Sequence, residues 1–141
     1  MKSYFTIEEL CKSDTAKKQN IDNTPSEEVI ERLKELIAFL NPIRKAWGSA
    51  IIVTSGYRCP ALNKAVGGSE TSVHQIGYGV DLVPKNGKTE EFKLFLEQYV
   101  KDNNLKWDQI LFEKSKGSIW VHLGLYNNYM QQRMIISHII K

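Results

Sequence analysis

Apolar residues recur at helical spacing after Ser26, and this pattern predicts the longest helix of the chain. Its apolar face comprises Val29, Ile30, Leu33, Leu36, Ile37 and Leu40. Residues 24–27 read Thr-Pro-Ser-Glu, a start signal that puts threonine at the cap and proline in the first turn. Pro42 removes a backbone donor and is expected to kink the helix, which then continues to Gly48.

Two further helices are predicted from their own start signals. Thr6 and Glu9 form a capping box, so a short helix should follow and end near Cys11. Residues 12–23 are polar and rich in turn-forming residues, which predicts a long surface loop. The other helix opens at Thr89 and turns aromatic and aliphatic side chains inward until a pair of asparagines ends it.

Short runs of β-branched and aromatic residues predict the strands. Residues 50–54 and 78–83 are two such runs. Residues 107–113 and 118–123 flank a four-residue loop that contains glycine, and this arrangement predicts a hairpin. The tail after Tyr126 fits either a short helix or an edge strand, of which we favour a strand that covers the sheet. These elements predict an α+β fold with a small, mostly antiparallel central sheet packed against helices.

At 141 residues the chain fits one domain, which can bury a core without disulfides. We divide it into an N-terminal helix and loop (1–23), a core (24–126) and a C-terminal tail (127–141), and we expect a monomer. The net charge of +3 is mild and its basic residues are scattered, which argues against a nucleic-acid-binding protein. The two cysteines, Cys11 and Cys59, do not indicate a disulfide framework.

The start of the chain lacks the apolar core of a signal peptide, and no segment approaches the length of a membrane span. We therefore expect synthesis in the cytoplasm. A substrate outside the membrane would then require another agent, such as a phage lysis pore, to deliver the protein.

The residues from Ser72 to Asp81 carry the clearest sign of chemistry. His74 and Asp81 lie seven residues apart across a Gly-x-Gly break, so a loop is needed to bring them together. Imidazole nitrogen and carboxylate oxygen are donors that zinc accepts, and a catalytic zinc typically takes three protein ligands. His122, in an apolar strand-like run, is the candidate third ligand, whereas His138 in the tail is expected at the surface.

Further residues around these three occur in a characteristic order along the chain. They are Ser55-Gly56-Tyr57-Arg58, Val66-Gly67-Gly68, the set Ser72, His74, Gly77 and Asp81, and Trp120-Val121-His122. The pattern resembles the signature of the zinc D-alanyl-D-alanine carboxypeptidase family, which includes phage L-alanyl-D-glutamate endopeptidases and shares its core fold with the hedgehog signalling domain. The resemblance covers residues 24–126. Gly79 departs from it, because relatives usually have alanine there, and we expect added flexibility.

The resemblance implies a zinc peptidase that hydrolyses peptidoglycan stem peptides or cross-links, as phage endolysins do. It implies that Glu113 acts as general base and acid, that Arg58 binds a carboxylate of the peptide substrate, and that Ser72 forms hydrogen bonds in the site. Gln109 is a polar neighbour that can support the oxyanion, and Asp108 is a substitute candidate for the base.

Two alternatives of other classes stay open. A zinc-stabilised binding module on the same fold would keep the ligands and lack the general base. A nuclease that uses histidine, carboxylate and a hard cation would need a more basic surface than this sequence provides.

Overall fold

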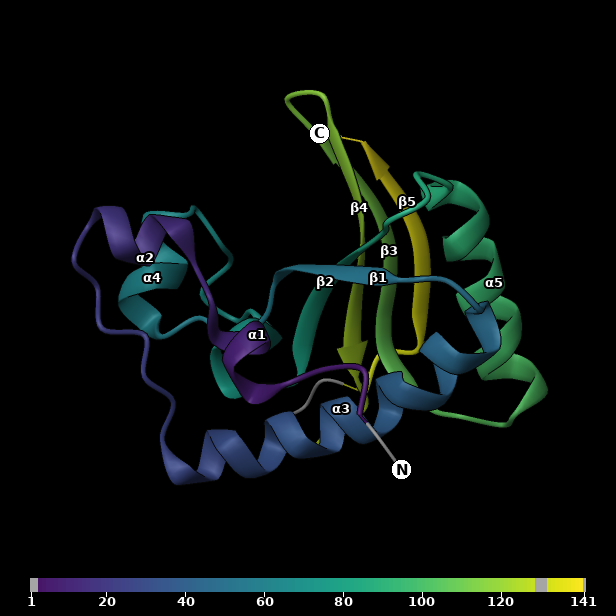
Figure 1. Ribbon diagram of the computed structural model, residues 1–141, viewed down its shortest axis with the longest axis horizontal. Coiled ribbons are helices and arrows are strands. Elements are labelled where there is room, and N and C mark those ends of the chain that lie inside the picture. The colour runs from purple at the N-terminus through teal and green to yellow at the C-terminus, as the bar shows by residue number, and fades with distance from the viewer. Residues whose placement is uncertain (1–2, 129–131, 141) are drawn as a thin grey trace.

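The structure, a computed structural model, describes the backbone of residues 3–128 and 132–140, and the side chains of these residues up to Ser137. The helices and strands, labelled in Figure 1, follow one another along the chain in a mixed order. They are α1 (Ile7–Cys11), α2 (Asp14–Lys18), α3 (Glu27–Trp47), β1 (Ile51–Ser55), α4 (Pro60–Ala65), the 3₁₀ helix η1 (Val73–Ile76), β2 (Gly79–Pro84), α5 (Thr89–Asp102), β3 (Trp107–Ser115), β4 (Ser118–Leu125) and β5 (Ile135–Ile140).

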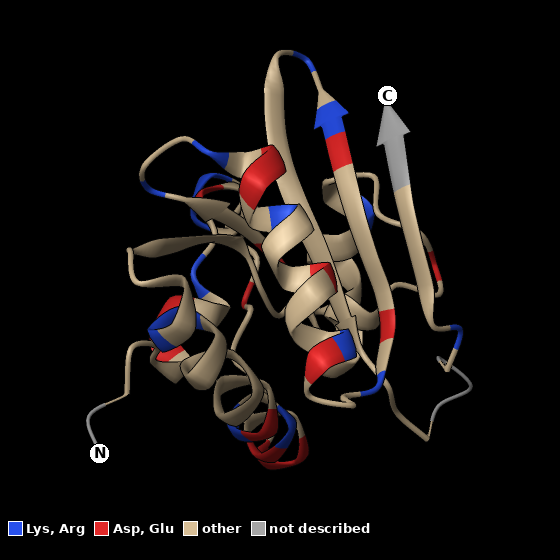
Figure 2. Cartoon of the chain, turned by 90° about the vertical axis from the view of Figure 1, so that its right-hand side faces the viewer, with Lys and Arg blue, Asp and Glu red and all other residues tan. Residues whose placement is uncertain are grey.

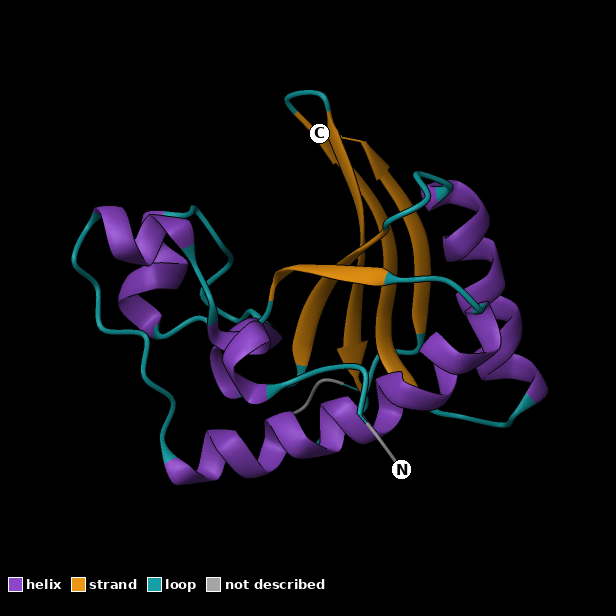
Figure 3. Cartoon of the chain, viewed as in Figure 1, coloured by secondary structure: helices purple, strands orange, loops and turns teal. Residues whose placement is uncertain are grey.

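The strands form a five-stranded sheet in the order β1-β2-β4-β3-β5. Neighbouring strands pair antiparallel, except that β5 runs parallel to β3. Figure 3 shows the sheet in the middle of the molecule, with α5 on one side and the short helices α1, α2 and α4 on the other. The predicted α+β fold with a small, mostly antiparallel sheet is confirmed.

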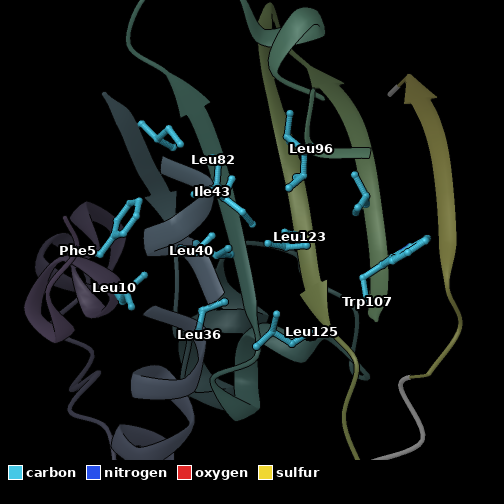
Figure 4. Close-up of a cluster of buried hydrophobic side chains, with 14 of the residues drawn as sticks. Phe5, Leu10, Leu36, Leu40, Ile43, Leu82, Leu96, Trp107, Leu123 and Leu125 are labelled. Carbon is cyan, nitrogen blue, oxygen red and sulfur yellow. The ribbon is translucent and has the colours of Figure 1, made fainter. Parts of the chain in front are cut away.

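Alternate residues of the central strands face in opposite directions, which separates the core from the candidate site. Val80 and Leu82 of β2, and Val121 and Leu123 of β4, are fully buried. They pack against the apolar faces of α3 and α5 in one cluster, part of which is drawn in Figure 4. The helix residues of this cluster include Leu33, Leu36, Leu40, Ile43, Phe92, Leu96 and Val100. The intervening residues of β2 and β4 face away from these helices.

Helix α3 begins later than predicted. Its N-cap is Ser26, whose hydroxyl accepts a hydrogen bond from the amide of Val29 at 3.2 Å. The Thr24 hydroxyl, the predicted cap, instead donates to the carboxylate of Asp22 at 2.6 Å. The amide of Thr24 donates to the same Asp22 oxygen at 3.0 Å, so Thr24 is held in a turn before the helix, and the helix starts at the next suitable hydroxyl. As predicted, the helix extends past Pro42.

The predicted loop at residues 12–23 is wrong in part, because it contains α2. The hydroxyl of Ser13 accepts a hydrogen bond from the amide of Ala16 at 3.1 Å and caps this one-turn helix. Ala16 is buried. A helix this short depends on such tertiary packing rather than on its own propensity, which is why a local pattern did not reveal it.

The hairpin between β3 and β4 is confirmed, but its turn is shorter than predicted. Only Lys116 and Gly117 lie between the strands, and both have positive φ, 48° and 82°. Two-residue turns of this kind match the twist of the paired strands. Glu113 therefore lies within the paired part of β3, opposite Trp120 in β4.

The tail forms the edge strand β5, which agrees with the strand alternative. Its backbone runs beside β3, and the indole nitrogen of Trp107 donates to the carbonyl of Ile135 at 3.2 Å. The side chain of His138 lies outside the described residues. On the face drawn in Figure 2, acidic and basic residues are interspersed along the helices. Within the described chain, every helix is too short or too polar to cross a lipid bilayer.

Candidate active site

The register of β2 against β4 brings two of the predicted metal ligands together. Asp81 is the direct cross-strand partner of His122. His74 reaches the same point from η1, which precedes β2. The Oδ1 atom of Asp81 lies 3.0 Å from Nδ1 of His122 and 3.3 Å from Nε2 of His74. One potential ligand atom from each residue lies within 4.8 Å of the others.

A pair of glycines allows η1 to lie directly on the sheet. Gly79 of β2 pairs with Gly124 of β4. A Cβ atom on Gly79 would approach Cγ2 of Val73 to 2.7 Å and the backbone nitrogen of His74 to 2.9 Å. A Cβ atom on Gly124 would lie 3.3 Å from the same Val73 carbon. Gly79 thus serves close packing beneath His74, rather than the flexibility expected from the sequence.

Hydrogen bonds fix the orientation of His74. Its Nδ1 atom lies 2.7 Å from the carbonyl oxygen of Gly56, so Nδ1 carries the proton it donates and Nε2 faces Asp81. Metal-binding histidines commonly have such a carbonyl partner on the second nitrogen. The amide of His74 donates to the hydroxyl of Ser72 at 3.2 Å, and its carbonyl accepts from the amide of Arg58 at 3.0 Å.

Gly56 is itself held by the first helix of the chain. The amide of Tyr57 donates to the carbonyl of Leu10 at 2.7 Å. A Cβ atom on Gly56 would lie 2.1 Å from the same Leu10 oxygen, so only glycine fits at this contact. The N-terminal segment therefore supports the residue that orients His74.

The three side chains are shielded from solvent, with exposed fractions of 2% for His74, 9% for His122 and 14% for Asp81. Burial by itself would raise the pKa of Asp81. The charges and hydrogen bonds of His74 and His122 together outweigh it and hold this pKa below its usual range. Asp81 is therefore an anion at neutral pH, in contact with two imidazoles.

These donors suit a divalent metal ion. With bonds of about 2.0–2.1 Å, the ligand atoms of a tetrahedral zinc lie roughly 3.3–3.4 Å apart. The contacts of 3.0 Å and 3.3 Å around Asp81 are close to this spacing. One anionic oxygen and two imidazole nitrogens also match the donor preference of zinc. The group of His74, Asp81 and His122 could hold a metal ion.

A pocket of about 530 Å³ opens beside this group. The other predicted site residues, Arg58, Ser72, Gln109 and Glu113, all line it. Burial lowers the pKa of Arg58, while the charges of Asp81 and Glu113 act in the opposite direction. Both carboxylates are therefore near the guanidinium. Its Nη2 atom also donates to the hydroxyl of Ser72 at 3.5 Å.

Comparison with known families decides the class of the protein. The model of the family described as Peptidase M15 matches residues 3–122. The chain belongs to the peptidase M15 family. No match was found among curated proteins. Membership confirms the resemblance to zinc D-alanyl-D-alanine carboxypeptidases and identifies a metallopeptidase of the M15 type.

The M15 fold positions Asp108 differently from the role considered for it. Asp108 is fully buried, and its two carboxylate oxygens accept hydrogen bonds from Nε and Nη2 of Arg133 at 2.8 Å and 2.6 Å. A carboxylate engaged in this way is unsuited to act as the general base. Glu113 lines the pocket and Asp108 does not.

Three residues around the M15 site were given no role by the sequence. Gly56 belongs to a motif that the sequence analysis singled out, but its carbonyl contact to His74 depends on the folded loop. Arg133 lies in the tail, beyond the region of the resemblance, where no local pattern marked it. Trp120, the cross-strand partner of Glu113, lines the pocket, and the sequence analysis named it only as part of the motif with His122.

Proposed function

We propose that this M15 peptidase uses zinc to hydrolyse peptidoglycan stem peptides or their cross-links. The observation that carries the proposal is the convergence of His74, Asp81 and His122 at one pocket that Glu113 also lines. A non-catalytic binding module would have no need of a carboxylate there. Action on the cell wall, for example as a phage endolysin, is part of the same proposal.

In this proposal His74 would hold the ion through Nε2, His122 through Nδ1, and Asp81 through a carboxylate oxygen. A zinc ion held there would polarise a peptide carbonyl and lower the pKa of bound water from about 15.7 toward 7. The carbonyl of Gly56 keeps the His74 ring in the tautomer that presents Nε2. The low exposure of the three side chains limits competition from bulk solvent.

Glu113 acts as the general base and acid of the proposed reaction. It lies on β3 two residues from Leu111, the cross-strand partner of His122, and so shares the face that carries the metal ligands. Its carboxylate would accept a proton from the attacking water and return it to the departing amine. One residue on the correct face can serve both steps.

The remaining pocket residues would bind and orient the peptide. Arg58, which Ser72 contacts, presents a guanidinium for a substrate carboxylate. The amide of Gln109 can donate to the oxygen that becomes negatively charged in the transition state. Ser72 also holds the backbone of His74, so it links substrate binding to the position of a metal ligand.

Incubation of the purified protein with peptidoglycan, with and without a chelator, tests the proposal. Mass spectrometry of the released fragments identifies the bond cleaved. Cleavage should stop with chelator and return with zinc. Glu113→Gln should bind zinc normally and lose cleavage, whereas His74→Ala should lose both. Glu90→Gln, on the exposed surface of α5, is the matched control and should behave as wild type.

Each failure has a distinct meaning in this experiment. Full cleavage by His74→Ala would contradict the metal assignment. Full cleavage by Glu113→Gln would assign the proton transfer to another residue. A zinc-loaded wild-type protein that binds peptidoglycan without cutting it would identify a binding module.

A further inference from the structure

A bulge in β3 turns a second aspartate toward the candidate site. Trp107 pairs with Leu125 and Gln109 with Gly124, so Asp108 is the extra residue between these pairs. Bulges of this kind re-aim side chains and are common beside active sites. A Cβ atom on Gly124 would lie 3.2 Å from Oδ2 of Asp108. The Asp108 carboxylate thus lies over Gly124, on the face of β4 that also carries His122.

This carboxylate holds Arg133 by three contacts. The side-chain Nε and Nη2 atoms donate to its two oxygens at 2.8 Å and 2.6 Å, and the backbone amide of Arg133 donates to Oδ1 at 3.2 Å. The paired fork fixes the plane of the guanidinium as well as its position. Because Arg133 lies two residues before β5, the contact also fixes where the tail approaches the pocket.

The two partners differ in their exposure. The side chain of Asp108 has no exposed surface, whereas 41% of the Arg133 side chain is exposed, and Arg133 lines the same pocket as His74 and Glu113. Among the residues that the structure describes, Asp108 receives all the hydrogen bonds of the Arg133 side chain. The guanidinium retains N–H groups on Nη1 and Nη2 for a second acceptor.

The charge and geometry of these N–H groups indicate which acceptor they can bind. A rigid, always charged guanidinium suits a carboxylate, to which it can form parallel hydrogen bonds. A buried ion pair is weak evidence for stabilisation, since apolar residues of similar volume often serve as well. The pair is better suited to holding a charged group at the pocket wall than to strengthening the fold.

We propose that Arg133 binds a carboxylate of the substrate peptide and that Asp108 is its positioning residue. This inference rests on the proposed peptidase function. Arg133 lies outside residues 3–122, the part matched by the family model, so this contact comes from the tail of this chain. Stem peptides with lysine as the third residue offer two sources of carboxylate: the C-terminal residue and the free α-carboxylate of a γ-linked glutamate. Arg133 makes hydrolysis depend on one of them.

Three synthetic stem peptides distinguish the sources: one with both carboxylates free, one amidated at the C-terminus and one amidated at the glutamate. For the wild-type protein, loss of the recognised carboxylate should lower kcat/KM by about 10- to 100-fold, the range of one charge-assisted hydrogen bond. The decrease in kcat/KM should come from a higher KM. The other amidation should have little effect.

The double variant Asp108→Asn, Arg133→Gln removes both charges together and leaves neither partner buried without a hydrogen-bonding group. It should hydrolyse all three peptides at similar rates, because the preference for a carboxylate is gone. Arg44→Gln, which removes a positive charge from α3 outside the pocket, is the control and should keep the preference. Calorimetric binding of the three peptides to zinc-loaded Glu113→Gln gives the same ranking without turnover.

Two results would overturn the assignment of Arg133. One is a wild-type protein that shows no preference among the peptides in hydrolysis or binding. The other is a double variant whose kcat/KM falls by the same factor on all three peptides, so that the wild-type preference persists; this result identifies a purely structural pair. Both leave the proposed peptidase function standing, whereas zinc-loaded wild-type protein that cleaves none of the peptides and no peptidoglycan refutes that function itself.

Discussion

Two aspartates on the same face of the sheet, Asp81 partly buried and Asp108 fully buried, have different partners, and the difference separates two tasks. Asp81 contacts two imidazoles, His74 and His122. Asp108 contacts the guanidinium of Arg133. An imidazole can lose its proton and then bind a metal ion beside the carboxylate, while a guanidinium is always positive. The Asp81 cluster could therefore hold a further cation, whereas the charge of Asp108 is compensated by Arg133.

The two clusters share one support. Val73 of η1 lies against Gly79 on β2, which adjoins His74, and against Gly124 on β4, which adjoins Asp108. The metal site and the Arg133 contact therefore share this packing, although their chemistry is separate.

Asp81→Asn should have the largest effect on function. The amide removes the negative charge of the metal-ligand cluster but keeps its size. Loss of an outer partner typically lowers metal affinity by about 10- to 100-fold, so loss of a direct ligand should lower it by more than about 100-fold. Zinc titration against a competing chelator measures the affinity, and peptidoglycan cleavage should fall with it. Unchanged affinity would show that Asp81 is not a ligand.

Asp108→Asn should lower the stability of the protein and leave zinc binding unchanged, in contrast to Asp81→Asn. It weakens two charge-assisted hydrogen bonds to Arg133 in a fully buried position, which should lower the free energy of unfolding by about 1.5–3 kcal/mol. Zinc affinity should stay close to that of the wild type. Denaturant unfolding and zinc titration on the same sample check both. If Asp108→Asn weakened zinc binding as strongly as Asp81→Asn, the separation of tasks would be wrong.

Alanine at the two paired glycines should affect the clusters unequally. At Gly79 the new Cβ meets the backbone of His74 at 2.9 Å, whereas at Gly124 its nearest neighbour is the Asp108 side chain at 3.2 Å. Overpacking typically costs about 1–3 kcal/mol. Gly79→Ala should lie at the upper end of that range and also weaken zinc binding.

Gly124→Ala is the internal control for this comparison. It should destabilise the protein less and leave zinc affinity near the wild-type value, because its contact is with Asp108 rather than His74. Thermal unfolding with and without zinc separates the two effects. Equal zinc affinity in both alanine variants would show that η1 shifts without carrying His74 away from the other ligands.

The sequence predicts those features that depend on local periodicity and on side-chain chemistry. The apolar faces of α3 and α5, the hairpin and the donor types of His74, Asp81 and His122 are of this kind. The predicted start of α3 was wrong because two hydrogen bonds to Asp22 hold Thr24, the expected cap, in the turn before the helix. The Arg133 contact could not be predicted, since it requires the bulge at Asp108 and the parallel register of β5, both set by long-range packing.

Ser72→Ala should have the smallest effect and tests how closely the metal-ligand cluster depends on its turn. The hydroxyl accepts a hydrogen bond from the amide of His74 at 3.2 Å, so its removal loosens the start of η1. A lost cap of this kind should lower the free energy of unfolding by about 0.5–1 kcal/mol. Zinc affinity should fall a few-fold, because His74 is less well held.

Ser26→Ala is the matched control for this variant, since Ser26 caps α3 with the same bond length of 3.2 Å. Ser26→Ala should lower the free energy of unfolding by a similar amount and leave zinc affinity unchanged. Unfolding curves and zinc titrations of the two variants, measured side by side, give the comparison. If both bind zinc as the wild type does, the carbonyl of Gly56 and the glycine pair suffice to hold His74, and Ser72 acts only on Arg58.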